Sequence, residues 1–131
     1  MSTDLDQVIA LNTAFYAAFE AGSAGGMLAL WEHSDDVSCT HPGWPTLHGW
    51  TDVRRSWEGI LRHGGAMQFI LTDERALVRG DVGWVHCTEN LLAVEGPRGT
   101  VAAVNLFVRN ESGQWKVLDH HGSQVVATMM N

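Results

Sequence analysis

The sequence predicts an α+β domain in which helices come first and an antiparallel sheet follows. Two changes of pattern support this class. Before Gly64 the apolar residues recur at helical spacing, whereas beyond Gly65 they alternate, and glycine-containing turn sequences separate the runs. The 131 residues are 45% hydrophobic, which is enough for one core. We therefore expect a single domain over residues 1–131, with helices covering one face of a curved sheet.

The first helix is predicted from its end signals and its apolar face. Thr3 is a suitable N-cap, and Gly22 is a suitable stop. The apolar face between them consists of Leu5, Val8, Ile9, Phe15, Tyr16 and Phe19. Asn12 shares this face, which is unusual in a core stripe and typical of a residue that looks into a polar cavity.

Two more helices and a short strand are expected before Gly64. A short helix begins near Ser23 and carries Met27, Leu30 and Trp31. A strand is expected at residues 37–40. The third helix ends before Gly64 and Gly65, and its apolar residues are Val53, Trp57, Ile60 and Leu61.

The second half of the chain is predicted to be an antiparallel meander. Short strands are expected at residues 67–72 and 76–78. Three long strands, at residues 82–94, 100–109 and 115–123, each follow a tight-turn sequence.

The charge balance excludes several classes of partner. Fifteen acidic and eight basic residues give a formal net charge of -7, which nucleic acid or an anionic membrane surface would repel. The longest apolar stretch, near residues 101–108, is too short to span a membrane. The N-terminal MSTDLDQ is acidic, unlike a secretory signal. We expect a cytoplasmic protein, without nucleic-acid or membrane partners, whose Cys39 and Cys87 are reduced.

Two motifs and the order of the elements resemble a known family. HPGW at residues 41–44 is followed by LHGW at 47–50, and WKVLDHHGS occupies 115–123. Together with the helix and strand order, they resemble the nuclear transport factor 2-like superfamily, most closely its SnoaL-like branch of polyketide cyclase and ketosteroid isomerase-like proteins. The resemblance covers nearly the whole chain.

The resemblance implies a cone-shaped fold and leaves the function open. Three N-terminal helices would pack on a strongly bent antiparallel sheet that encloses a pocket, and the protein would form a homodimer through the sheet. Folds of this kind serve isomerases, dehydratases, cyclases, ligand binders and assembly domains.

The segment CTHPGWPTLHGW, residues 39–50, is predicted to form a lid and wall for such a pocket. Trp44 and Trp50 would cap the mouth of the cone, and Pro42 and Pro45 would stiffen the loop. His41 begins this loop and would face the cavity. The alternative is that His41 bonds to the loop backbone and holds its shape.

Aromatic and polar residues of the covering helices are further candidates for the pocket lining. Trp31, Trp44 and Trp57 would form an aromatic wall, with Tyr16 and Asn12 from the first helix. The alternative for the tryptophans is an ordinary place in the core.

Strand alternation selects the other candidate site residues. In the last strand one face carries Trp115, Val117, Asp119, His121 and Ser123. We expect this face to line the cavity, because Lys116 on the other face favours water. Asp119 would then orient the imidazole of His121, or either would act as a base, while His120 would point outward. The alternative is a structural pair of Asp119 and His121.

The two central long strands offer amides and a histidine. In residues 82–94, one face carries His86 and Asn90, and its polar character suits a wet cavity wall. The other face carries Val85, Cys87, Glu89 and Leu91 and suits a dimer surface. The alternative is the reverse assignment of the two faces. Asn105 lies among apolar neighbours, so it either bonds across strands or points at a ligand.

These candidates indicate acid–base chemistry without a cofactor or a metal. His121 or Asp119 would remove a proton beside a carbonyl, and His41, Asn90 or Asn105 would stabilise the oxyanion. The sequence contains no C-x-x-C or H-x-x-x-H pair, no P-loop and no dinucleotide fingerprint.

We therefore predict a small-molecule pocket protein, acting as a cofactor-independent isomerase, dehydratase or cyclase on a small apolar or aromatic molecule. Ketosteroid isomerase, in the group that the chain resembles, uses an aspartate base with an oxyanion hole of a tyrosine and a protonated aspartate. Tyr16 is the only tyrosine here, and no second acid aligns with that pattern. The alternatives are a noncatalytic small-ligand-binding module and a homodimerising association domain.

Overall fold

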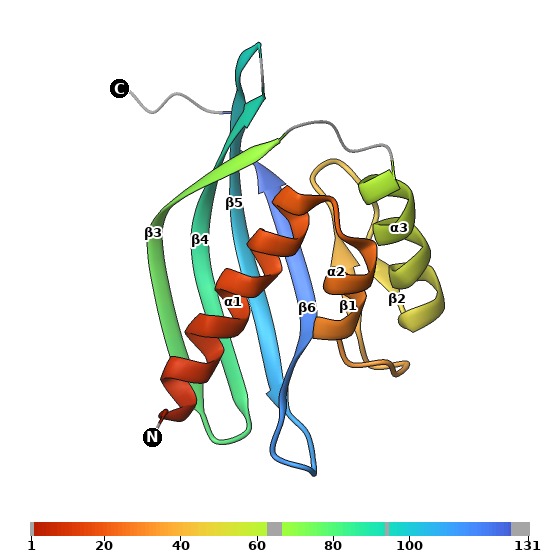
Figure 1. The fold of residues 1–131 in the computed structure, drawn as a ribbon, viewed down its shortest axis with the longest axis vertical. Coiled ribbons are helices and arrows are strands. Elements are labelled where there is room, and N and C mark those ends of the chain that lie inside the picture. Colours follow the sequence, from red (N-terminus) through yellow and green to blue (C-terminus); the bar gives the residue numbers. More distant parts are fainter. Residues whose placement is uncertain (1, 63–66, 94, 127–131) are drawn as a thin grey trace.

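The computed structural model describes residues 2–62, 67–93 and 95–126. Three helices pack on one face of a six-stranded sheet, which confirms the α+β class (Figure 1). The elements in chain order are α1 (Asp4–Ala21), α2 (Ala24–Leu30), β1 (Ser38–Thr40), β2 (Leu47–His48), α3 (Trp50–Arg62), β3 (Gln68–Arg79), β4 (Val82–Ala93), β5 (Gly96–Arg109) and β6 (Trp115–Gln124). Gly64, Gly65 and Val94, which the predicted boundaries include, lie outside the described residues.

The strands follow the order β2-β1-β6-β5-β4-β3 across the sheet. The meander from β3 to β6 is antiparallel, as predicted. The first strand, β1, pairs with β6 in parallel, so the sheet is mixed rather than wholly antiparallel. Helix α1 crosses the sheet over β3 and β4, while α3 lies against β1 and β2 (Figure 1). No helix within the described ranges is long and apolar enough to cross a membrane.

The end signals of α1 behave as the sequence indicates. Thr3 and Asp6 form a capping box, in which each side chain bonds to the backbone N–H of the other residue. Gly22 closes the helix in the left-handed conformation, with φ of 64°. The one face that α1 buries carries Asn12 and Tyr16 together with Val8 and Phe15, as the spacing predicts.

The two short strands expected between residues 67 and 78 are one strand, β3. A bulge between Thr72 and Arg75 interrupts its pairing with β4, and Asp73 there has a φ of 52°. The bulge explains why the alternating pattern seemed to break at this point. It bends β3 beside the site described below.

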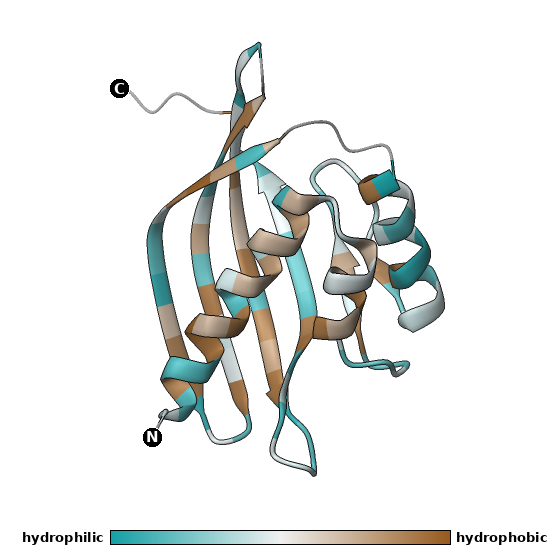
Figure 2. Ribbon diagram, viewed as in Figure 1, coloured by the Kyte–Doolittle hydropathy of each residue, from teal (hydrophilic) through white to brown (hydrophobic). Residues whose placement is uncertain are grey.

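The core lies between the helices and the sheet. Buried and more exposed residues alternate along much of β4 and β5, and β5 is mainly hydrophobic, whereas α3 shows a largely hydrophilic outer face (Figure 2). The largest fully buried side chains include Phe15, Trp31, Trp57 and Phe107. Aromatic packing against the sheet therefore fills much of the interior.

Candidate active site

On β4, the side chains that point toward the helices are not the polar set that the sequence analysis expected there, but the opposite set. Val85, Cys87 and Glu89 are 2, 3 and 3% exposed, whereas His86 is exposed on the outer face. Asn90 also faces outward and donates to the Ile70 carbonyl oxygen on β3, at 2.9 Å. The predictions that His86 and Asn90 line the cavity are therefore wrong. Alternation defines two faces, but it does not say which of them the helices cover.

The inward face of β6 also differs from the prediction, for a different reason. The pairing with β5 shifts between Leu106 and Phe107, so that Leu118 is an extra residue on β6. After this bulge His120 points inward and is 1% exposed. His121 and Asp119 consequently lie on the outer face, away from the helices. The expectation that these two residues line the cavity is wrong.

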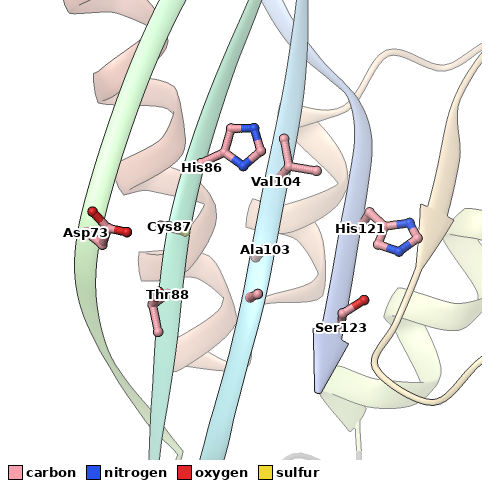
Figure 3. Close-up of a pocket in the computed structure, with 9 residues that line it drawn as sticks. Asp73, His86, Cys87, Thr88, Ala103, Val104, His121 and Ser123 are labelled. Carbon is pink, nitrogen blue, oxygen red and sulfur yellow. The ribbon is translucent and has the colours of Figure 1, made fainter. Parts of the chain in front are cut away.

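The outward residues border an open hollow of about 310 Å³ on the outer face of the sheet. Its lining residues are Asp73, His86, Cys87, Thr88, Ala102, Ala103, Val104, His121 and Ser123. Figure 3 shows His86 and His121 on either side of Val104, on the side of the sheet opposite the helices. Asp119 accepts a hydrogen bond from Ser38 Oγ at 2.6 Å, which ties β6 to β1. Asp119 thus bonds to a neighbouring strand, and among the described residues no hydrogen bond joins it to His121, so the alternative of a structural pair of these two residues is not seen.

The loop after β1 buries its histidine and exposes its first tryptophan. His41 is 4% exposed, whereas Trp44 is 45% exposed and meets the His41 ring edge-on at 4.9 Å. Trp31 and Trp57 are buried in the core, and the Trp57 ring lies 4.8 Å from His41. Of the predicted aromatic wall, only Trp44 is therefore on the surface.

A buried polar cluster joins α1 to the centre of the sheet. Tyr16 and Asn12 lie one helical turn apart on the buried face of α1. They meet Glu89 from β4, Asn105 from β5 and His120 from β6. Asn12 and Asn105 are 1 and 0% exposed, so each polar atom here needs a partner.

The hydrogen bonds of this cluster fix the direction of each donor. Asn105 Nδ2 donates to Asn12 Oδ1 at 2.8 Å and to the Tyr16 hydroxyl at 3.2 Å. The Asn105 oxygen must then accept, so His120 Nδ1–H donates to Asn105 Oδ1 at 2.5 Å. The Tyr16 hydroxyl donates to Glu89 Oε2 at 2.5 Å. A continuous chain of hydrogen bonds therefore connects His120 to Glu89.

Burial sets the protonation states of the cluster. Desolvation raises the pKa of Glu89 to about 7, although the Tyr16 hydrogen bond partly opposes this rise. Burial, followed by the charge of Glu89, raises the pKa of Tyr16 well above its ordinary value. Burial lowers the pKa of His120 to about 3. Near neutral pH, Glu89 is therefore the one member of the cluster that exchanges a proton readily.

A second buried histidine lies beside the cluster. The Ser56 hydroxyl donates to the Val53 carbonyl oxygen at 2.7 Å, so His41 Nε2–H must donate to Ser56 Oγ, at 2.9 Å. The ring thus bonds to a side chain rather than to the loop backbone. Burial lowers the pKa of His41 to about 4, so the ring is neutral near pH 7 and its Nδ1 can accept a hydrogen bond. The His41 and His120 ring centroids are 6.3 Å apart.

Two hollows lie along α1, and the Tyr16–Glu89 pair lines neither of them. The first, of about 290 Å³, is lined by Leu5, Ile9, Asn12, Glu74, Ala76 and Val85. The second, of about 240 Å³, is lined by Phe19, Gly22, Ile60, Leu61, Met67, Phe69 and Leu91. In sequence order along α1 and β4, Tyr16 and Glu89 lie between the residues that line the first hollow and those that line the second. The titratable carboxyl of Glu89 is thus buried between the two hollows and does not line either of them.

Metal-binding groups do not gather in this part of the molecule. Within residues 2–62, 67–93 and 95–126, no three His, Cys, Asp or Glu side chains are placed to hold a metal ion. Cys39 and Cys87 are free and buried, and burial raises the pKa of both thiols, that of Cys87 to about 11. Neither thiol is a reactive nucleophile at neutral pH.

The sequence analysis missed Glu89, His120 and Ser56 as site residues. A signal for Glu89 was present, because a glutamate among Val85, Cys87 and Leu91 is out of place on either an apolar core face or a dimer surface. Tyr16, for which no partner acid was aligned, finds one in Glu89. His120 carries no comparable signal, since its inward position depends on the bulge at Leu118.

Comparison with solved structures finds proteins of the same fold that cover nearly the whole chain. A proposed dehydratase of the nuclear transport factor 2-like family from Streptomyces avermitilis is 41% identical, with a TM-score of 0.86, over 95% of this chain and 97% of its own. A proposed calcium/calmodulin-dependent protein kinase type II association domain from Thiobacillus denitrificans is 29% identical, with a TM-score of 0.83, over 90 and 94%.

A more distant structure agrees in fold alone. A ketosteroid isomerase-like protein from Erwinia carotovora atroseptica is 16% identical, with a TM-score of 0.76, over 97% of this chain and 100% of its own. Comparison with curated proteins finds no match. The family model of the SnoaL-like domain matches residues 8–128. The chain therefore belongs to the SnoaL-like family of the nuclear transport factor 2-like superfamily.

Proposed function

We propose that this protein is a cofactor-independent acid–base enzyme in which Glu89 transfers the proton. The observation that carries the proposal is the buried Tyr16–Glu89 hydrogen bond, together with the rise of the Glu89 pKa to about 7. A carboxyl group that titrates near neutrality can both accept and return a proton at working pH. Glu89 takes the role that the sequence analysis gave to His121 and Asp119.

Dehydration is the reaction that the site and its relatives support best. The Glu89 carboxylate would remove the proton on the carbon beside a carbonyl, and the bond to a hydroxyl on the next carbon would break. Glu89 would return the proton to the departing hydroxyl, which leaves as water and restores the carboxylate. The 41% identical relative, described as a proposed dehydratase, supports this class. An isomerase or a cyclase would use the same proton transfer.

The ligand would be a small, largely apolar molecule in the groove between α1 and strands β3 and β4. The two hollows there are lined mainly by aliphatic and aromatic side chains. Tyr16 acts as a positioning residue, because its hydroxyl holds one carboxylate oxygen of Glu89. The neutral ring of His41 offers Nδ1 as a hydrogen-bond acceptor near the cluster.

The test is turnover of a panel of β-hydroxy ketones, followed by the ultraviolet absorbance of the enone product. We expect kcat/KM to fall tenfold for each pH unit below about 7, because Glu89 must be ionised to act as a base. Glu89→Gln should lower kcat by ~100- to 10,000-fold. Tyr16→Phe should move the rising limb to higher pH, because the Tyr16 hydrogen bond lowers the Glu89 pKa.

Glu111→Gln, in the exposed turn between β5 and β6, is the matched control and should keep full activity. Turnover that survives Glu89→Gln would overturn the assignment of Glu89 as the base. Binding of panel members without turnover would favour a noncatalytic binding module instead.

We also propose that a second copy docks on the outer face of the sheet. Val104, Leu106 and Val108 face outward along β5 and are partly exposed. The expected dimer surface also included Val85 and Cys87, which are instead buried under α1. The 29% identical relative described as an association domain supports self-association.

A further inference from the structure

A row of side chains crosses the outer face of the sheet, and two of its members are histidines. Val104 of β5 pairs with His86 of β4 on one side and with His121 of β6 on the other. Both histidines are exposed, and Figure 3 shows them flanking Val104. We call these three residues the histidine row. It lies on the face opposite α1 and the Tyr16–Glu89 pair.

The outer face has a different shape on each side of the histidine row. Two residues along the strands in one direction lies a ridge of large side chains, which consists of Leu77, Trp84 and Leu106. Two residues along in the other direction lie the small side chains of Thr88, Ala102 and Ser123. These small residues line the open hollow of about 310 Å³. The face therefore carries a ridge on one side of the row and a hollow on the other.

Such a face is complementary to itself. A two-fold axis along the histidine row, in the plane between two copies, reverses the strand direction and places the ridge of each copy over the hollow of the other. The exposed apolar surface of the ridge, where Leu77 is 39% exposed, would then leave water. A two-fold axis parallel to the strands would instead set ridge against ridge and leave both hollows unfilled.

Protonated histidines would oppose each other across this interface. A side chain on the two-fold axis meets the same side chain of the other copy, so His86 would face His86 and His121 would face His121. Histidine changes its charge between pH 5 and 8, and burial of a charged group without a counter-ion is costly. The contact would therefore be favourable with neutral rings and unfavourable with charged ones.

The other charged groups on the outer face of the described strands come from β3 and β6. Asp73 lines the hollow, and its carboxylate already pairs with Arg75 at 3.3 Å. Asp119 is hydrogen-bonded to β1. Arg79 and Lys116 lie beyond the ridge and are cationic. Carboxylate, guanidinium and ammonium groups keep their charges between pH 5 and 8, so the histidines are the groups that change theirs.

We propose that two copies pack on their outer faces with the two-fold axis along the histidine row, and that protonation of His86 and His121 separates them. This inference rests on the proposed docking of a second copy and adds its register and its dependence on pH. Long-range charge acts in the opposite direction, since protonation makes the formal net charge of -7 less negative and reduces the repulsion between copies. A dimer that weakens as the pH falls therefore reports the local contact.

The test of the pH dependence is sedimentation over a range of protein concentrations, at pH 8.0 and pH 5.5 and at constant ionic strength. Each histidine that must lose its proton on docking weakens the dimer up to about tenfold for each pH unit in which the free ring is protonated. We expect the Kd of the dimer to be at least about tenfold higher at pH 5.5. Far-ultraviolet circular dichroism at pH 5.5 should match that at pH 8.0, which separates dissociation from unfolding.

Variants assign the effect to the histidine row. The double variant His86→Gln, His121→Gln should keep the wild-type Kd at pH 8.0 and lose the rise at pH 5.5. His48→Gln, exposed on β2, is the matched control and should keep the rise. If the double variant does not form a dimer at pH 8.0, the wild-type profile and the cross-link below still decide.

Cysteine cross-linking tests the register. The proposed axis sets Leu106 of one copy over Ala102 of the other, since each lies two residues from Val104 on β5. On mild oxidation at pH 8.0, a mixture of Leu106→Cys and Ala102→Cys should form a disulfide between the two variants, and Leu106→Cys alone should not. A cross-link in Leu106→Cys alone, or none in the mixture, would overturn the register.

The sedimentation outcomes have distinct meanings. A Kd that is unchanged or lower at pH 5.5 would overturn this inference and leave the docking of a second copy in place. A rise that persists in the double glutamine variant would do the same, because other groups would then be responsible. A monomeric wild type at pH 8.0 would overturn both the inference and the docking.

Discussion

Replacing Glu89 by glutamine should change the pH dependence of folding stability. The folded protein raises the pKa of this carboxyl from its ordinary 4.5 to about 7. Between these two values the folded state holds a proton that the unfolded state releases. The stabilising contribution is therefore fully present below pH 4.5, and it is lost as the pH rises through about 7. Glutamine does not titrate, so Glu89→Gln removes this pH dependence.

The magnitude follows from the pKa difference. A difference of 2.5 units at 1.36 kcal/mol per unit corresponds to about 3 kcal/mol. The free energy of unfolding of the wild type, minus that of Glu89→Gln, should fall by this amount between pH 4.5 and 7.5. His41 and His120, whose pKa values are lowered by burial, lose stability as the pH falls below 6.5. They do so in both proteins, so their effect cancels in the difference.

Urea unfolding followed by tryptophan fluorescence measures this difference at a fixed protein concentration, at half-unit steps of pH. Glu111→Gln is the control, and its difference from wild type should stay within about 0.5 kcal/mol at every pH. Parallel stability curves for wild type and Glu89→Gln would refute the reasoning. A difference that grows with pH would refute it as well.

Two further predictions concern packing and assembly. Gly83→Ala should cost about 1–3 kcal/mol in urea unfolding, because the new Cβ would lie 2.8 Å from Val8 Cγ2 of α1. Gly59→Ala, with open space around it, should be neutral or stabilising, and equal losses for the two would contradict the packing of α1 on β4. In sedimentation at micromolar concentration, wild type should be a dimer and Leu106→Glu a monomer. A monomeric wild type would exclude docking through the outer face.

The sequence predicted the helices and the order of the elements well, because these depend on local signals. Thr3 and Gly22 bound α1 as expected, and the spacing of Asn12 and Tyr16 correctly placed both on its buried face. The strand β2 was not predicted, since two residues, Leu47 and His48, are too few to show alternation.

Which face of each strand points toward the helices could not be predicted as well from the sequence. Along β4 the more polar set, with His86, faces outward, and the set with Glu89 is buried. A single inserted residue, Leu118, exchanges the faces of everything after it on β6. That exchange moved His120 into the site and His121 out of it.

The pairing of Tyr16 with Glu89 depends on contact between residues 73 positions apart in the chain. The sequence showed a tyrosine on a helix and a glutamate in a strand, but no local pattern joined them. The raised pKa of Glu89 likewise arises from burial under α1. Both the Tyr16–Glu89 contact and the raised pKa of Glu89 arise only when α1 packs on the sheet.

Titration of the Glu89 side chain tests the central claim most directly. In protein labelled with [¹³C]glutamate, the carboxyl carbon signal that Glu89→Gln removes can be followed from pH 3 to pH 9. We predict a midpoint near pH 7, as expected for a carboxyl buried against Tyr16. A midpoint near the ordinary value of 4.5 would contradict the account, because Glu89 would then be a solvated carboxylate and a weak base at neutral pH.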